Sequence, residues 1–301
     1  MGLNVSALND FNNELAGELL VKSVYGGSTM EYITVKEGIK YQEPINLFEV
    51  DLALQGGTCV STPSGSAVFS QRNITVCPRT SFDGLCLKDL DKKYLGISSL
   101  EPGSYNETWA LANAYSGLLV NQFQKANDQF LWSGDQAGCD ASYGLTTIIS
   151  GSTAGVVTAG TADATLTNMD AMIAALSSDV ADRDDLTFFM SVSKFRQFVS
   201  DIRTSNSYYF DPAAISNRGG ILEMAYPFQN IKVVGTVGLQ GSGRIVLGPA
   251  KQVVAGTDLM SDFSEFQLWY DINSDELKHR ISTKLGVNIA YPEFWVSNDV
   301  A

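Results

Sequence analysis

Residues 264–296, "SEFQLWYDINSDELKHRISTKLGVNIAYPEFWV", contain two runs in which apolar and polar residues alternate, joined by a short polar segment. The first run alternates through Phe266, Leu268, Tyr270 and Ile272, the turn falls at residues 273–275, and the second run alternates through Leu277, His279 and Ile281. A period of two is the side-chain period of a strand with one buried face. The stretch therefore predicts a long antiparallel β-hairpin.

A second informative stretch, "SYNETWALANAYSGLLVNQFQKANDQFLWSGD", spans residues 104–135. Ser104 and Glu107 form an S-x-x-E capping box directly after Pro102-Gly103, which is a helix-start signature. Apolar residues then recur at helical spacing on one stripe until Gly134. At about 1.5 Å per residue, the predicted helix over 104–131 is a rod of roughly 40 Å.

Residues 26–90 change character and predict a second long hairpin. One strand-like run alternates through Phe48, Val50, Leu52 and Leu54, and another through Ile74 and Val76. The segment between them, "GGTCVSTPSGSA" at 56–67, is rich in turn-forming residues. This hairpin has too little apolar surface to form its own core, and an isolated hairpin is marginal in water. It must lie on the body of its own chain or on a neighbouring subunit.

The other segments predict a mixed order of helices and strands. Residues 1–24 have the pattern of a short acidic helix, and residues 140–163 that of a Gly-rich connection with one strand. Two helices follow, capped by Thr167 with Asp170 and by Ser193, with a short buried strand between them. We assign the pairs Met169/Met172 and Phe195/Phe198 to the core. Strand-like pieces at 230–239 and 243–256 complete an α+β fold.

Composition and charge exclude several classes of function. The chain has 301 residues, is 45% hydrophobic and 18% charged, and carries a net charge of −13, which fits a folded protein. The negative charge argues against a dedicated nucleic-acid binder and against docking on an anionic membrane surface. No run of about 18 apolar residues predicts a membrane span, and we expect the four cysteines to be free thiols.

No motif predicts chemistry. The lone His279 lies in a predicted strand and supplies neither a catalytic triad nor a metal site with two histidines. The stretch "GLQGSGRIVLG" at 238–248 lacks the order of a phosphate loop and is typical of a hairpin turn. The acidic pairs Asp184-Asp185 and Asp275-Glu276 fall in predicted turns. We therefore predict no catalytic residue, cofactor or metal, and a protein that is not an enzyme.

The order of these pieces, closing with "RISTKLGVNIAYPEFWV" at 280–296, resembles the major capsid protein of tailed bacteriophages, the Hong Kong ninety-seven type fold. The resemblance covers nearly the whole chain as a pattern of elements. It implies an N-arm, an E-loop hairpin, a P-domain built from a long spine helix and a long β-hairpin, and an A-domain. The implied ranges are 1–25 for the N-arm, 26–92 for the E-loop, 93–144 for the first part of the P-domain with the spine helix at 104–131, 145–263 for the A-domain, and 264–301 for the closing hairpin of the P-domain.

The resemblance also implies a function. The chain would be a structural protein that self-assembles as hexamers and pentamers into an icosahedral shell around phage double-stranded DNA, without sequence-specific binding. It would be found in the virion capsid after assembly in the host cytoplasm, with portal, scaffold and decoration proteins as further partners and no membrane. Some relatives crosslink an E-loop lysine to a neighbour, but nothing here identifies an acceptor, so we do not predict crosslinking.

The functional residues are then those of subunit interfaces, where aromatic side chains and arginines are favoured anchors. We predict such contacts at Phe48, Phe69, Arg72 and Arg79 of the E-loop and at Tyr208, Tyr209 and Arg218 of the axial loops. Two alternatives stay open. One is an encapsulin-type nanocompartment shell with the same fold, and the other is a different class, a carboxylate-dependent hydrolase or a β-rich adhesin.

Overall fold

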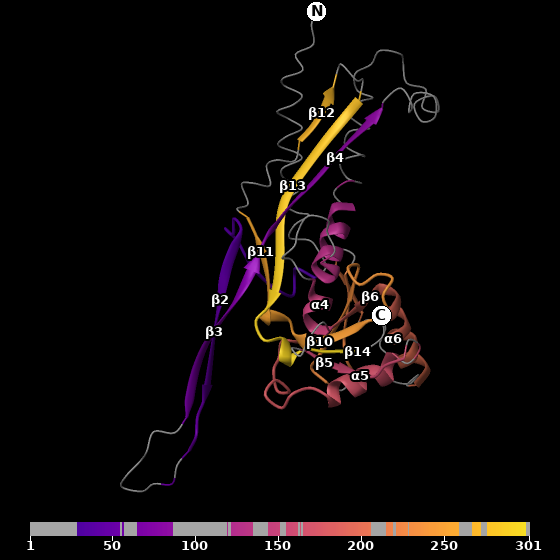
Figure 1. Cartoon of the computed structure of the whole chain (residues 1–301). Coiled ribbons are helices and arrows are strands. Elements are labelled where there is room, and N and C mark those ends of the chain that lie inside the picture. Colours follow the sequence, from indigo (N-terminus) through magenta and orange to yellow (C-terminus); the bar gives the residue numbers. More distant parts are fainter. Residues whose placement is uncertain are drawn as a thin grey trace, which may run out of the picture.

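The computed structural model describes residues 29–54, 56, 65–86, 119, 122–134, 144–150, 155–161, 163, 165–205, 215–218, 221–227, 229–258, 267–271 and 276–298. The predicted N-arm at 1–25, most of the predicted spine helix at 104–131, and the loop residues Tyr208 and Tyr209 lie outside these ranges. The described part is an α+β fold built on two sheets and a separate two-stranded hairpin. Figure 1 shows the hairpin projecting away from the part that carries the helices.

A five-stranded sheet is organised around one long strand, β13 (Glu276–Ile289). One edge of β13 pairs antiparallel first with β12 (Gln267–Asp271) and then with β11 (Val253–Thr257), while its other edge pairs with β4 (Cys77–Cys86). The short strand β1 (Thr34–Lys36) adds to β11 in parallel. Asp271 pairs with Glu276, so the two strands of the predicted closing hairpin are present, and the turn predicted at 273–275 lies outside the described residues.

The second sheet has seven strands in the order β5-β14-β10-β6-β9-β8-β7. Its central strand β6 (Leu186–Ser191) is buried at every residue, as the apolar run "LTFFMS" predicts. The strands around it are β5 (Val156–Thr158), β14 (Val296–Asn298), β10 (Ile245–Pro249), β9 (Lys232–Thr236), β8 (Ile221–Ala225) and β7 (Ser216–Arg218). The sheet is mixed, because β6 runs parallel to β9 and antiparallel to β10.

The helices lie mainly around this second sheet (Figure 1). They are α4 (Leu145–Ser150), α5 (Thr165–Ala174) and α6 (Val192–Ser205), with 3-10 turns η3 (Ala250–Gln252) and η5 (Pro292–Phe294). Residues 122–133 are also helical, and they are the described part of the predicted spine helix.

Two large hydrophobic clusters form the core. One packs α5 and α6 against the seven-stranded sheet, and Met169, Met172, Phe195 and Phe198 are buried in it as predicted. The other joins the helical segment 122–133 to both sheets through residues that include Trp132 and Trp295. Because this second cluster takes side chains from both sheets, it holds the two sheets together.

Strand pairing adds detail to the predicted domain ranges, which remain predictions. Within the range 26–92, only β2 (Gln42–Asp51) and β3 (Ser66–Thr75) form the hairpin, whereas β1 and β4 pair with β11 and β13. Conversely, β14 at the end of the chain pairs with β10 and β5 of the other sheet. The chain therefore crosses between the two sheets several times.

Several local predictions are wrong. Residues 145–150 form helix α4 within the stretch predicted as a connection. The turn at 238–243 does not close a hairpin, because β9 and β10 lie on opposite sides of β6 rather than beside each other. Helix α5 begins before Thr167, and the amide of Lys194 in α6 is capped by Ser191 Oγ at 3.3 Å rather than by Ser193.

Candidate assembly interface

The β2–β3 hairpin leaves the body with its two faces in different environments. Antiparallel register pairs Ile45 with Arg72 and Leu47 with Ser70 on one face, and Phe48 with Phe69 on the other. Leu47 and Ile74 of the first face are buried, so this face rests on the body near the hairpin base. The opposite face has no such cover within the described part of the chain.

The uncovered face carries an apolar patch, which we define as Phe48, Val50 and Phe69. The rings of Phe48 and Phe69 stack at 4.4 Å between centroids, and their exposed fractions are 53% and 78%. Val50, two register pairs closer to the tip on the same face, is exposed as well, and Leu52 and Leu54 continue the apolar run beyond the strand. Contiguous exposed apolar side chains of this size mark an interaction surface.

Acidic residues lie on the other face of the hairpin from the patch. Glu49 and Asp51 alternate with the apolar residues of β2 and are exposed on the opposite face. Val68, which pairs with Glu49, is exposed on that face too, so the acidic face also carries an apolar side chain. The exposed apolar patch favours a partner surface with aromatic or aliphatic groups.

The predicted E-loop anchors have different local roles. Phe48 and Phe69 lie in the exposed patch, and Arg72 is half-buried on the face that rests on the body. The Arg79 guanidinium lies 4.5 Å from the centroid of the Phe130 ring and donates from Nη1 to Asn127 Oδ1 at 2.8 Å. Arg79 therefore ties β4 to the helical segment 122–133 of its own subunit.

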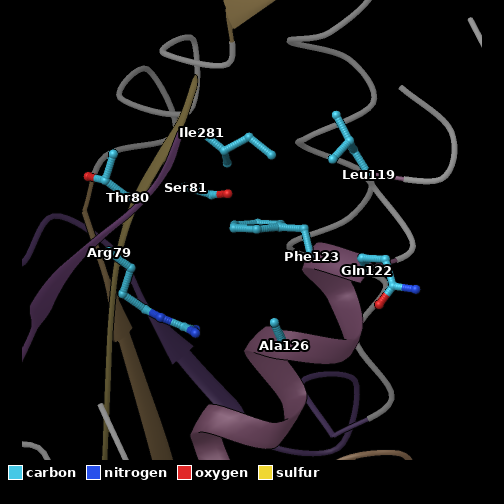
Figure 2. A pocket seen from close by; sticks show the side chains of 8 residues that line it. All are labelled: Arg79, Thr80, Ser81, Leu119, Gln122, Phe123, Ala126 and Ile281. Carbon is cyan, nitrogen blue, oxygen red and sulfur yellow. The ribbon is translucent and has the colours of Figure 1, made fainter. Parts of the chain in front are cut away.

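A cavity of about 310 Å³ opens beside Arg79, between β4 and the helical segment. Figure 2 shows Phe123 reaching across from the helix toward Ser81 and Ile281, with the guanidinium of Arg79 pointing toward Ala126. The lining is predominantly apolar and has no acidic side chain among the described residues.

The remaining predicted anchors belong to the axial loops. The backbone of Arg218 ends strand β7 at one edge of the seven-stranded sheet. Tyr208 and Tyr209 lie outside the described residues, so all three stay predictions as interface residues.

The distal part of the five-stranded sheet has an exposed aromatic residue, Phe82, that sequence reasoning missed. Phe82 of β4 is exposed, and its ring lies 6.1 Å from the ring of Trp269 in β12, centroid to centroid. On the same face Lys278 Nζ pairs with Asp271 at 2.6 Å, which raises the pKa of that lysine. The alternation of residues 264–272 locates Trp269, but pairing with β4, which brings in Phe82, is non-local.

The titratable groups that we considered for chemistry have structural roles. His279 is buried, its Nε2 lies 3.5 Å from Ser81 Oγ, and burial lowers the pKa of its imidazole. Asp185 accepts two hydrogen bonds from Arg183, at 2.7 and 2.8 Å, and this pairing lowers the pKa of the carboxyl group. Among the described residues, no cluster of three or more His, Cys, Asp or Glu side chains could hold a metal ion.

The cysteines show no bridge where the structure describes them. Cys77 is a buried free thiol. Cys77 and Cys86 stand at opposite ends of the extended strand β4, facing Leu285 and Glu276 on β13. Ten extended residues span about 30 Å, so these two cysteines cannot pair within one chain. In the part of the chain that the structure describes, no helix is long and apolar enough to cross a membrane.

Comparison with solved structures identifies the fold. The chain matches the "capsid of native GTA particle" with a TM-score of 0.56 and 14% identity, covering 90% of this chain and 89% of that one. It matches the procapsid of satellite phage P4 (TM-score 0.55, 10% identity, 93% and 89% covered) and a virus-like particle from Pyrococcus furiosus (TM-score 0.53, 10% identity, 95% and 98% covered). No protein-family model and no curated protein matches the chain.

These matches span nearly the whole chain at low identity, so they establish the fold rather than the function. The α+β fold is that of phage capsid proteins, as the order of sequence elements predicts. The exposed hairpin is therefore an element of a fold that is found in closed particles.

Proposed function

We propose that this chain is the major subunit of an icosahedral shell. In this proposal it is a structural protein, not an enzyme, and copies of the chain are its principal partners. The observation that carries the proposal is the projecting β2–β3 hairpin with its uncovered Phe48/Val50/Phe69 patch, on a fold shared with capsid proteins. No described residue of the same chain covers this patch, and closed symmetry would supply a covering neighbour to every copy.

The finer parts of the proposal follow from the same fold. Hexamers and pentamers would form the shell, and the enclosed cargo would be phage double-stranded DNA held without sequence readout. The net charge of −13 supports a container that repels packed phosphate rather than gripping it. Portal, scaffold and decoration proteins would be additional partners in a virion assembled in the host cytoplasm.

The apolar patch also supports a head-to-tail interface between copies. The hairpin projects from its subunit with the patch on one face only, so it can reach a surface of the next copy that differs from the patch. A heterologous contact between a hairpin and a different surface of the next copy builds rings when the rotation closes.

Negative-stain electron microscopy of the full chain expressed alone, with light scattering on the same sample, tests the proposal. We expect closed shells, or rings of five or six copies. If the chain instead stays monomeric at high concentration, even when it is coexpressed with the scaffold and portal genes of its own source, the shell function is wrong.

The contents of purified shells separate the two kinds of container. Nuclease-protected double-stranded DNA of uniform length supports a virion capsid. Shells that hold a defined enzyme and no DNA would support the nanocompartment alternative.

A further inference from the structure

The base of the hairpin rests on two glycines that face each other across the five-stranded sheet. Gly256 of β11 and Gly286 of β13 are direct cross-strand partners. Both present their missing side chains to the hairpin side, where Ile39, Ile74 and Val76 form a small buried cluster of their own. We call the pair Gly256/Gly286 the glycine seat.

The opposite face of the same strands belongs to the main core. Ala255 and Val287, which flank the glycines along the two strands, are buried in the cluster that holds Trp132 and Trp295. Large side chains of the main core therefore pack on one face of these strands, while at the two glycines the hairpin side packs directly on the backbone, next to Val254.

The two glycines differ in what a side chain would meet. A Cβ at Gly286 would lie 2.0 Å from the carbonyl oxygen of Thr75, which is backbone at the junction of β3 and β4. A Cβ at Gly256 would lie 2.9 Å from Ile39 Cδ1 and 3.0 Å from Ile74 Cδ1, which are the ends of flexible side chains. A substitution at Gly286 must therefore move the chain itself, whereas one at Gly256 can be accommodated by trimming its neighbours.

Few contacts fix the direction of the hairpin beyond this base. Asn288 Nδ2 donates to the carbonyl oxygen of Asn73 at 2.7 Å, and Tyr291 Oη donates to that of Phe48 at 3.3 Å. Both bonds are exposed to solvent, where a single hydrogen bond adds only about 1 kcal/mol. Close packing at the seat is the stronger constraint on the direction in which the hairpin projects.

We propose that the Gly256/Gly286 pair sets the tilt of the β2–β3 hairpin relative to its own subunit, and thereby the angle at which the hairpin meets the next copy. The first half of this inference concerns the isolated subunit, and the second half rests on the shell function proposed above. Strands of ten residues rise about 3.3 Å per residue, so a small displacement at the base becomes several times larger at the patch.

The test uses two spin labels carried by non-natural amino acids, which leaves the native cysteines in place. One label replaces Val68 on the hairpin and the other replaces Ser200 on α6, both of them exposed. Pulsed electron paramagnetic resonance then measures the distance between the labels in dissociated subunits. We expect the mean distance to change by roughly 5 Å in Gly286→Ala and by less in Gly256→Ala.

Two further variants make the result specific. Ile39→Val and Ile74→Val remove the two Cδ1 atoms that a Cβ at position 256 would meet, so adding both to Gly256→Ala should restore the wild-type distance. Gly84→Ala on β4 is the matched control, because its Cβ would approach only side-chain atoms of Glu276 and Lys278, at 3.2 Å and beyond. Retained protection of the Val76 amide, which donates to Tyr41 O at 2.8 Å, reports that the hairpin itself stays folded.

An unchanged distance in folded Gly286→Ala subunits would overturn the inference, as would equal shifts in Gly286→Ala and Gly84→Ala. Electron microscopy of the same variants tests the second half. The second half is supported if Gly286→Ala forms shells of altered diameter or no shells. It also requires normal shells from the triple variant Gly256→Ala/Ile39→Val/Ile74→Val. If the distance shifts as expected but the wild type forms no shells, the glycine seat does set the tilt of the hairpin in the subunit, and the proposed shell function is wrong.

Discussion

The rings of Phe48 and Phe69 lie 4.4 Å apart, centroid to centroid, on paired strands of a hairpin, and more than half of each side chain is exposed. A stacked aromatic pair contributes about 0.5–1.5 kcal/mol beyond the burial of its surface area. This is less than the free energy that full burial of two phenylalanine side chains would contribute. We therefore expect a partner to cover both rings.

Substitution of both rings should separate folding from assembly. We expect Phe48→Ser/Phe69→Ser subunits to unfold within about 1 kcal/mol of the wild type, because neither side chain is buried in the subunit. Assembly should fail, because each aromatic anchor at an interface is worth about 2 kcal/mol or more and every copy loses two of them. Urea unfolding and electron microscopy measure the two effects.

Val157→Ser is the control for this pair. It removes an exposed apolar side chain from strand β5, at the edge of the seven-stranded sheet, which does not include the hairpin. Normal shells from the double serine variant would contradict the assignment of the patch as an interface.

A second prediction concerns Asp128, a buried carboxylate on the helical segment 122–133. Its Oδ1 accepts the amide of Thr29 at 3.1 Å and its Oδ2 accepts the amide of Gly238 at 2.6 Å. Asp128→Ala strips both amides of this acceptor, and we expect a loss of about 2–4 kcal/mol in the free energy of unfolding. Asp128→Asn keeps one acceptor oxygen and should lose less.

Chemical denaturation measures the free energy of unfolding of the wild type, Asp128→Ala and Asp128→Asn, and ranks the three proteins by stability. Asp182→Ala, on an exposed turn, is the control and should change stability by at most about 0.5 kcal/mol. Equal stabilities for Asp128→Ala and the wild type would mean that Asp128 does not connect the helix to the two loops.

Local patterns in the sequence predicted the elements whose partners are near in the chain. Alternation found β2–β3 and β12–β13, because side chains in a strand alternate between faces whatever lies beyond them. Helical spacing likewise placed Met169 and Phe195 in the core. These signals need no knowledge of distant residues.

The rest depends on contacts between distant residues. Helix α4, "LTTIIS", contains β-branched residues and serine, whose low helix propensity is overridden by packing of Ile149 into the core. The register that sets Gly256 opposite Gly286 is a property of the folded sheet. Arginine is also favoured at interfaces in general, so the sequence could not indicate that Arg79 lies over Phe130 of its own subunit.

A third prediction follows from the single histidine of the chain. Burial lowers the pKa of His279 below its ordinary value of 6.5, so the unfolded state binds a proton before the folded state does. The stability that neutral His279 contributes is complete above pH 6.5 and declines as the pH falls below it. In that window the stability should fall with decreasing pH by at most about 1.4 kcal/mol per pH unit.

Urea unfolding of dissociated subunits between pH 7.5 and about pH 5.5 measures this slope above the range where carboxylates titrate. His279→Gln should have a flatter profile in the window, whatever its stability at pH 7.5. A profile of equal slope in the wild type and the variant would assign the pH dependence to other groups.

The last prediction decides between two roles for arginines that we expected at the interface. Arg79 contacts Phe130 and Asn127 within its own subunit, so Arg79→Ala should lower the free energy of unfolding by about 1–3 kcal/mol. Arg79→Lys keeps the charge but loses the planar guanidinium, and should recover only part of that stability. Arg72→Ala, half-buried on the hairpin face that rests on the body, should lower the free energy of unfolding by less than Arg79→Ala and reduce the yield of shells. Parallel measurement of unfolding and shell yield for the three variants tests this division.

If Arg79→Ala subunits are as stable as the wild type yet form no shells, Arg79 acts between subunits and its contacts with the helical segment are incidental.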